Sequence, residues 1–343
     1  MSSIHDINKD VVAKLRHALY DLNPDTILSV MDEVFSPHAA IHLTHPFGDL
    51  TGPKELFETA YQPLIHAVPD LERRDFIVMA GPSNTEGDWV GCGGHYVGVF
   101  EQPWLDIPPT CHPVAMRFHE FFRVEGGRIT EMQAIWDIPQ LMMQARAWPM
   151  SPSLGVEWMI PAPATQDGLS LSPRDDNRAE ASQKLVLDML NGLSKHADHG
   201  PEAMTLDAFW HPKMTWYGPA GIGTNRRISG FRNWHQIPFL KAMPDRGSAS
   251  DNCHHFFADG DYVAVTGWPN MRMTISGDGW LGIAPAGQPL TMRSLDFWRC
   301  ENGLIRENWV LVDILHVYHL LNVDVFERMR EFTIDRQAVR PPL

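Results

Sequence analysis

Two acidic side chains occupy matching places in segments that are otherwise apolar. Glu120 follows Phe118 on one face of a β-like stretch, and Asp296 lies in a similar stretch near the other end of the chain. A carboxyl group removed from water keeps its proton and can donate it, or a hydrogen bond, to a developing oxyanion. We therefore predict that both carboxyls face apolar pockets. The alternative is an ion pair with a nearby arginine, Arg117 or Arg293, although in a regular strand these point to the opposite face.

Histidines are the second group of side chains able to move protons near neutral pH. His45 precedes a Pro-Phe-Gly bend and His95 lies in a Gly-rich stretch, and each is also compatible with a purely structural place. Three pairs are close in sequence, and none has the HExxH form or a clear third ligand, so we expect no metal. No phosphate-binding glycine loop or nucleophile elbow is present, and no cofactor is expected. The close pairs are His42 and His45, His254 and His255, and His316 and His319.

An internal repeat sets the elements that must position these side chains. The segment MRFHEFFRVEGGRITE at 116–131 aligns with MRSLDFWRCENGLIRE at 292–307, with eight of sixteen positions identical at an offset of 176. This offset places Glu120 over Asp296 and Asp137 over Asp313. Upstream, Pro-Asp at 69–70 recurs at 244–245. The chain is therefore expected to hold two copies of one domain.

The two copies are separated by a segment rich in proline, serine and aspartate. We predict a first domain over residues 1–146, an extended linker over 147–178 and a second domain over 179–343. Within the first copy, helical spacing comes first, including a helix over 53–68. β-like stretches follow near 76–80, 89–100, 114–124 and 128–136. Helices segregated to one face of a mostly antiparallel sheet define an α+β fold.

Composition excludes several classes of partner. With 343 residues, the chain is long enough for two cores. The formal charge of −14 argues against a nucleic-acid partner and against docking on an anionic membrane. The N-terminal residues lack a signal-peptide pattern, and the four cysteines are too scattered for a disulfide framework. We expect a cytoplasmic protein.

Three motifs carry a resemblance to a known family. They are the final hairpin at 120–136, the Gly-His-Tyr-Val-Gly-Val-Phe strand at 94–100, and the His-Pro-Phe-Gly bend at 45–48. In order and spacing they resemble SnoaL-like and ketosteroid-isomerase-like proteins, which have the nuclear transport factor 2-like fold. The resemblance covers both copies and implies two tandem cone-shaped α+β barrels. Ligands of such folds enter the open end of the cone.

The resemblance also implies roles for residues of the first copy. Matched to the isomerase, His45 takes the place of the general base and Glu120 that of the acid that stabilises an enolate. His95 and Asp137 are further candidates for proton transfer, and Phe118, Met132 and Trp136 are expected to line the ligand site. For Asp137 and its counterpart Asp313 there is an alternative, because aspartate before an apolar helix is a favoured N-cap.

The two copies depart from the family pattern and from each other. The His and Asp of the cyclases' last strand are replaced in both copies, which argues against a polyketide-cyclase label. At the position of His45 the second copy has Gly218, so the first copy is the better candidate for proton chemistry. The second copy is interpreted as a binding or structural partner. Its predicted ligand-binding residues are Tyr217, Trp268, Asp296, Asn308 and Asp313.

The resulting hypothesis is a cofactor-independent lyase or isomerase. It would transfer a proton on a hydrophobic carbonyl or hydroxy compound through an enolate-like intermediate. The alternative is a non-catalytic protein that binds a small molecule or takes part in assembly. The two copies are expected to pair as an intramolecular pseudo-dimer, and a further homodimer stays open. The test is geometric: if Glu120 is locked to an arginine, the search for chemistry moves to Asp296 and the second copy.

Overall fold

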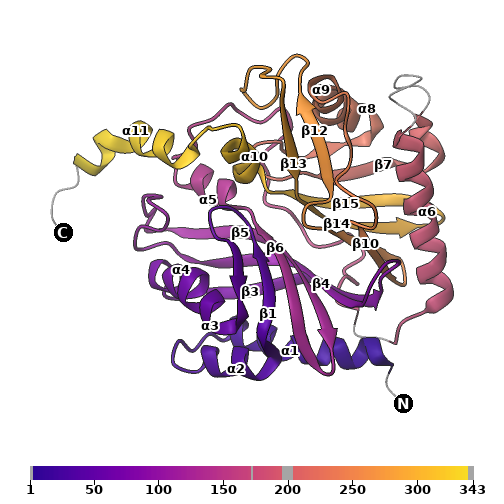
Figure 1. Ribbon diagram of the computed structural model, residues 1–343, viewed down its shortest axis with the longest axis horizontal. Helices are drawn as coiled ribbons and strands as arrows, with labels where there is room; N and C mark the ends of the chain where they lie inside the picture. Colours follow the sequence, from indigo (N-terminus) through magenta and orange to yellow (C-terminus); the bar gives the residue numbers. More distant parts are fainter. Residues whose placement is uncertain (1–2, 171–172, 195–203, 339–343) are drawn as a thin grey trace.

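The computed structural model describes residues 3–170, 173–194 and 204–338. The predicted bounds at residues 1 and 343, and the stretches 171–172 and 195–203, lie outside the described residues. Figure 1 shows the first half, coloured indigo to magenta, which runs from α1 to β6 and α5. Beside it lies the second half, coloured rose through orange to yellow, which runs from α6 to β15, α10 and α11. We refer to these halves as the first and second domains.

The first domain begins with helices and continues with strands, as its sequence pattern predicts. Ser3 and Asp6 form a capping box at the start of α1, and Val12, Leu15 and Leu19 make its buried face. Its helices are α1 Ile4–Tyr20, α2 Ile27–Val34, α3 Gly52–Leu56, the π-helical turn η1 Phe57–Tyr61, α4 Gln62–Ala67 and α5 Ile138–Gln144. Its strands are β1 Phe35–Leu43, β2 Gly48–Thr51, β3 Glu72–Pro82, β4 Asp88–Val99, β5 Pro113–Glu125 and β6 Arg128–Trp136.

The second domain repeats this order with shorter strands. Its helical elements are α6 Asp176–Ser194, η3 Leu206–Ala208, α8 Arg227–Phe231, the π-helical turn η4 Arg232–Gln236, α9 Ile237–Ala242, α10 Ile314–Leu320 and α11 Val325–Ala338. Its strands are β7 Trp210–Tyr217, β8 Asn225–Arg226, β9 Gly247–Ser248, β10 His255–Asp259, β11 Tyr262–Thr266, β12 Met271–Ile275, β13 Gln288–Met292, β14 Ser294–Glu301 and β15 Leu304–Val312. Helix α11 extends away from the body of the molecule (Figure 1).

Each domain is built on a six-stranded mixed sheet. The orders are β2-β1-β6-β5-β4-β3 and β10-β11-β14-β15-β7-β8. One pair in each is parallel, β1 with β6 and β7 with β15, and the other neighbours are antiparallel. The predicted α+β class is confirmed. The sheets do not close into barrels within the described residues.

The last hairpin of each domain shows how sequence sets local structure. Between β5 and β6, Gly126 and Gly127 have φ of 57° and 76°, and between β14 and β15 Asn302 and Gly303 have φ of 53° and 76°. Two-residue hairpin loops require left-handed backbone at both positions, which glycine and asparagine tolerate. The repeated hairpin therefore places Glu120 and Asp296 at the same height in their sheets.

The outer faces of the two sheets pack on each other through an apolar cluster that is separate from the cores inside the two domains. Phe121 and Phe297, which are equivalent at the offset of 176, stack with ring centroids 5.0 Å apart. His119 Nδ1 lies 2.6 Å from the carbonyl oxygen of Leu295, its own equivalent. The connecting segment contacts both domains, because Leu169 pairs with Val78 of β3 and residue 156 with residue 224.

Candidate functional site

Glu120 and Asp296 both point into their own domains, away from the contact between the sheets. Each lies one residue from a phenylalanine, Phe121 or Phe297, that belongs to the interdomain cluster. Because successive side chains of a strand alternate between faces, the two carboxyls are on the inner faces. Their surroundings are different.

The carboxylate of Glu120 is held by three donors. Arg73 Nη1 donates to Oε2 at 2.5 Å, and Tyr96 Oη and Trp136 Nε1 both donate to Oε1 at 2.9 Å. Glu120 and Arg73 are 0% and 1% exposed. Hydrogen bonds from a guanidinium are shorter and stronger than neutral ones. Glu120 is therefore satisfied as an anion and takes part in a buried ion pair.

The interior around this ion pair is filled with aromatic rings. Arg73 lies over the ring of Phe118 at 4.1 Å, and its Nη2 pairs with Asp75 at 2.9 Å. Tyr61 and Tyr96 have ring centroids 5.3 Å and 5.5 Å from Trp136. The side chains Phe118, Met132 and Trp136, which the sequence predicts at a ligand site, are packed here with 1% exposure or less.

The interior of the second domain contains a cavity of about 500 Å³. Asp296 lines it together with Asn308, so two of the predicted ligand-binding residues are brought together. The wall is largely aromatic, and its rings come from both helices and strands. The aromatic lining residues are Trp210, Trp216, Phe231, Phe239, Phe256, Trp280 and Trp298.

Four replacements account for the difference between the two interiors. At the offset of 176, Phe118 and Trp136 correspond to Ser294 and Val312. In the helical region the offset is 175, as the π-helical turns at 57–61 and 232–236 show, so Tyr61 and Arg73 correspond to Gln236 and Ser248. Each replacement removes volume. All four second-domain residues line the cavity.

Asp296 lacks the partners that hold Glu120. Its Oδ1 accepts a hydrogen bond from Ser294 Oγ at 2.5 Å, and within the described part of the chain no lysine or arginine forms an ion pair with it. Burial raises the pKa of Asp296 to about 7, against the opposing effects of the Ser294 hydrogen bond and the positive charge of Arg117. A carboxyl group with this pKa is populated in both protonation states near neutral pH, which suits an acid or base catalyst.

Several of the residues that line the cavity also have a buried polar atom without a hydrogen-bond partner among the described residues. These atoms include the indole nitrogens of Trp210 and Trp298, the amide oxygen of Gln236 and Nδ1 of His235. His235 stacks on Trp216 with centroids 4.0 Å apart, and burial lowers its pKa to about 3, so the imidazole is neutral. Sequence reasoning missed these four residues. A signal for two of them is present in the sequence: the offset of 175 aligns Gln236 with Tyr61 and so indicates the π-helical turn at 232–236, which contains Gln236 and His235.

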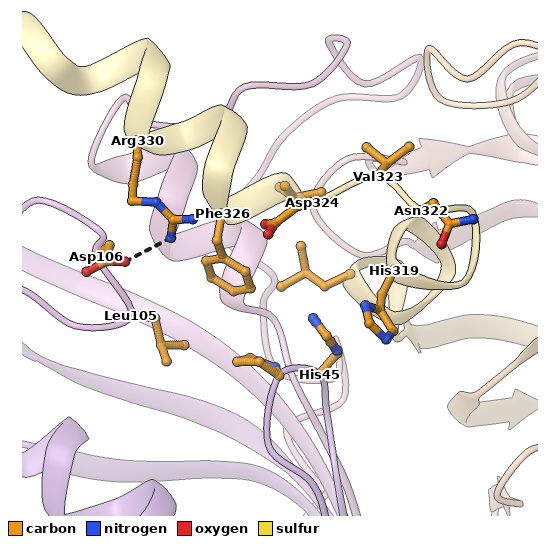
Figure 2. Close-up of a pocket in the computed structure, with 12 residues that line it drawn as sticks. His45, Leu105, Asp106, His319, Asn322, Val323, Asp324, Phe326 and Arg330 are labelled. Carbon is orange, nitrogen blue, oxygen red and sulfur yellow. Dashed lines mark hydrogen bonds and ion pairs between the residues drawn. The ribbon is translucent and has the colours of Figure 1, made fainter.

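His45 lies in a different place from Glu120. It lines a cleft of about 580 Å³ between the first-domain bend and helices α10 and α11, and Glu120 is not among the lining residues. Its ring stacks on His319 with centroids 4.6 Å apart (Figure 2). Burial lowers the pKa of His45. Figure 2 also shows the ion pair between Arg330 and Asp106 at this cleft.

The first of the two repeated aspartates binds the opposite domain. Asp137 accepts a hydrogen bond from the backbone N–H of Ala220 at 3.0 Å and lies 3.6 Å from Arg117 Nη2. Its position precedes α5, but its side chain makes no capping hydrogen bond there. Burial raises the pKa of Asp137 to about 6.

Asp313 makes the reciprocal contact. Its Oδ2 accepts from the backbone N–H of His45 at 3.0 Å, and its Oδ1 from Thr44 Oγ1 at 3.1 Å. It also accepts from the N–H of His316 at 3.2 Å and so caps α10, as the alternative interpretation of this aspartate expects.

The remaining predicted residues lie at or near the contact between the domains. His95 is 5% exposed and packs on Phe76, and burial lowers its pKa to about 3. Tyr217 Oη donates to Glu307 Oε1 at 3.0 Å. The ring of Trp268 lies under Arg293 at 4.3 Å. None of these three is among the residues that line the second-domain cavity.

Two further searches concern metals and membranes. Among residues 3–170, 173–194 and 204–338, no three His, Cys, Asp or Glu side chains are grouped as metal ligands. No helix in that part of the chain is long and apolar enough to span a membrane.

Comparisons with known proteins agree with the tandem arrangement. A family model described as SnoaL-like polyketide cyclase matches residues 13–145 and 195–319. IdmH from Streptomyces antibioticus has 24% identity and a TM-score of 0.34, covering 40% of this chain and 96% of its own. A SnoaL-like protein from Jannaschia sp. CCS1 has 22% identity and a TM-score of 0.34, covering 42% of this chain and 94% of its own. A protein described as a polyketide cyclase from Xanthomonas campestris pv. campestris has 19% identity and a TM-score of 0.35, covering 42% of this chain and 99% of its own. No curated protein matches the chain.

Proposed function

This chain belongs to the SnoaL-like polyketide cyclase family, and on that premise we propose that it is a cofactor-independent enzyme working in the cavity of its second domain. The reaction is proton transfer on a hydrophobic carbonyl or hydroxy compound through an enolate-like intermediate. Asp296 is the acid and base. The first domain, whose interior is filled, serves as its structural partner.

One observation carries this proposal. Asp296 is a carboxyl without an ion-pair partner among the described residues, on the wall of a cavity of about 500 Å³, and burial raises its pKa to about 7. A cavity of this volume falls in the range of small-molecule sites. The equivalent Glu120 has neither the cavity nor a free oxygen. The proposal therefore keeps the strand position that the sequence analysis expected for the acid. It moves the reaction from Glu120 in the first copy to the equivalent Asp296 in the second.

The chemistry follows from the groups on the cavity wall. Ionised Asp296 takes a proton from a carbon next to a carbonyl, and the electron pair of that C–H bond forms the enolate. We assign the hydrogen bond to the enolate oxygen to Trp210 or Trp298, because both side chains line the cavity and a turn of either ring brings to it an indole N–H that is buried and without a protein partner among the described residues. In a ring closure, the enolate carbon bonds to a second carbonyl carbon, whose oxygen then takes the proton back from Asp296. In an isomerisation, the proton returns to another carbon.

A second candidate function is binding without turnover. It is favoured by the aromatic wall and the unpartnered indole donors, which suit a planar ligand that carries oxygen acceptors. His45, the base expected from the family resemblance, lines another cleft. The binding function therefore predicts affinity for such ligands without any proton exchange.

The experiment measures proton exchange, so it does not require the natural substrate. The probe is a panel of enolisable ring ketones, with 2-tetralone as the first, incubated in D₂O and followed by NMR for deuterium next to the carbonyl. We expect Asp296→Asn to reduce enzyme-dependent exchange by about 10²–10⁴-fold, while quenching of tryptophan fluorescence shows that the ketone still binds.

Glu301→Gln is the matched control, because Glu301 is on the same strand but does not line the cavity. It should leave exchange unchanged. Exchange that survives in Asp296→Asn overturns the role of Asp296. Ketone binding without any exchange in the unmodified protein favours the binding function instead.

A further inference from the structure

Arg117 is a residue of the first domain whose side chain serves the second. It lies in the middle of β5, is 0% exposed, and reaches across the contact between the sheets. Its Nη1 donates to the carbonyl of Tyr217 at 3.2 Å, and its Nη2 donates to the carbonyls of Gly218 at 2.8 Å and Val310 at 2.9 Å. One guanidinium therefore joins the end of β7 to the middle of β15.

The backbone that Arg117 holds lies directly behind the cavity wall. Val310 is the cross-strand partner of Asp296 in the register of β14 and β15, and its side chain lines the cavity. Trp216, which precedes Tyr217, lines the cavity as well. The clamp thus joins β7, which presents aromatic rings to the cavity, to β15, whose lining residues are Asn308, Val310 and Val312.

The equivalent arginine of the second domain is bound differently. Arg293 lies over the ring of Trp268 at 4.3 Å and pairs with Asp313 at 3.4 Å. Within the described residues it donates to no backbone carbonyl. The contact between the domains is therefore asymmetric, and the stronger clamp is on the side of the open cavity.

The positive charge of Arg117 also acts on Asp296. The guanidinium of Arg117 lowers the pKa of Asp296 and so opposes the effect of burial. Asp137, paired with Arg117 at 3.6 Å, partly offsets that positive charge. The other titratable groups on the cavity wall are His235, His254 and Arg246, and the charge that shifts the pKa of Asp296 is that of Arg117.

We propose that Arg117 is a positioning residue for the second-domain site: from the first domain it fixes the strand opposite Asp296 and places a positive charge behind the cavity wall. This inference rests on the proposed function of Asp296. It gives the first domain a role in the reaction that does not require a cavity of its own. A chain lacking Arg117 would hold Asp296 in its protonated form to higher pH.

The test follows the titration of Asp296 in the full chain without any substrate. Aspartate labelled with ¹³C at the carboxyl carbon is titrated by NMR, and Asp296→Asn identifies the signal. We expect Arg117→Gln to raise the pKa of Asp296 by about half a unit to one unit, since nearby charges shift carboxyl groups by about 1–3 units and this one acts through the sheet. Arg293→Gln is the matched control and should give no shift.

A second variant keeps the proposal testable if Arg117→Gln does not fold. Asp137→Asn retains the guanidinium and removes its counter-charge, so it should lower the pKa of Asp296. Arg117→Lys keeps the positive charge, so it should leave the pKa of Asp296 close to its value in the unmodified protein. Equal shifts in Arg117→Gln and Arg293→Gln, or no shift in any variant, would overturn the inference.

The two proposals fail in different ways. If Arg117→Gln shifts the titration while exchange of 2-tetralone is independent of that titration, the proposed function of Asp296 fails and the effect of Arg117 stands. If exchange depends on Asp296 but neither the titration nor the acid limb of the exchange profile moves in Arg117→Gln, only the role of Arg117 fails.

Discussion

The two domains place a carboxyl at the same point of the same hairpin and use it in opposite ways. In the first, Glu120 accepts from Arg73, Tyr96 and Trp136 and stabilises a filled interior. In the second, Asp296 accepts from Ser294 alone among the described residues and faces a cavity. The residues that satisfy one carboxyl are replaced by smaller ones around the other, and under the proposed function the duplicated fold separates stability from chemistry in this way.

The sheets differ in the same direction. Strands β3, β4 and β5 are continuous in the first domain, whereas their counterparts are divided into β9 and β10, β11 and β12, and β13 and β14. The interruption at 267–270 contains Pro269, which cannot donate to a strand ladder. Continuous strands bring Arg73 across to Glu120. In the second domain, divided strands accompany the smaller side chains around the cavity.

The largest expected effect is on stability, from breaking the ion pair of the first domain. Glu120→Gln leaves the guanidinium of Arg73, which is 1% exposed, without its full counter-charge. Removing one partner of a buried pair costs about 3–5 kcal/mol, and Asp75 should keep the loss near the lower end. Urea unfolding measures it. Asp296→Asn is the comparison and should not lose stability at pH 8. Similar losses at both positions would remove the contrast between the domains.

The second prediction exchanges volume between the two interiors. Trp136→Val should destabilise the protein by about 3 kcal/mol, because it leaves a void and removes a donor to Glu120. The reverse change, Val312→Trp, puts an indole into the second-domain cavity. It should weaken 2-tetralone binding by at least about tenfold, or 1.4 kcal/mol.

Fluorescence titration and urea unfolding of both variants check this exchange. Trp136→Val should bind the ketone as the unmodified protein does, since Trp136 is not among the residues that line the cavity. Unchanged binding in Val312→Trp would show that the ligand sits elsewhere, with the cleft at His45 as the next place to search.

The repeat in the sequence predicts much of the fold. Its constant offset equates Glu120 with Asp296, and the helix–strand order predicts two α+β domains, as found. Strand β1 at Phe35–Leu43, which lies between β2 and β6, was missed, because with Pro37 and two histidines it lacks a clear alternating pattern. Burial of its side chains by the neighbouring elements, rather than local propensity, makes it a strand.

The site was predicted less well, because side-chain partners depend on contacts that cross the sheet. Arg117 was weighed as the partner of Glu120, whereas Arg73, two strands away, is the partner that the structure shows. Trp136 was assigned to a ligand site, yet its indole fills that interior. The sequence does contain a signal for the open interior. Comparing side-chain volumes at equivalent positions, such as Trp136 with Val312, shows which copy has the smaller residues.

The last contrast is a pH dependence that only the second of these two carboxyls should show. Burial raises the pKa of Asp296 from an ordinary value of 3.8 to about 7, so the folded protein keeps a proton that the unfolded chain releases above pH 4. Stability contributed by the protonated group is therefore lost as pH rises towards 7, by about 1.4 kcal/mol per pH unit for one full proton. Asp296→Asn cannot titrate.

The free energy of unfolding of this variant, relative to the unmodified protein, should therefore increase from pH 4.5 to pH 7 and level off by pH 8. Urea unfolding at these values measures the difference. Glu301→Gln is the control: the hydrogen bond from Arg299 lowers the pKa of Glu301, so its difference should be flat above pH 5. Parallel curves for the unmodified protein and Asp296→Asn would mean that Asp296 is as well satisfied as Glu120, and the division of labour between the two domains would no longer hold.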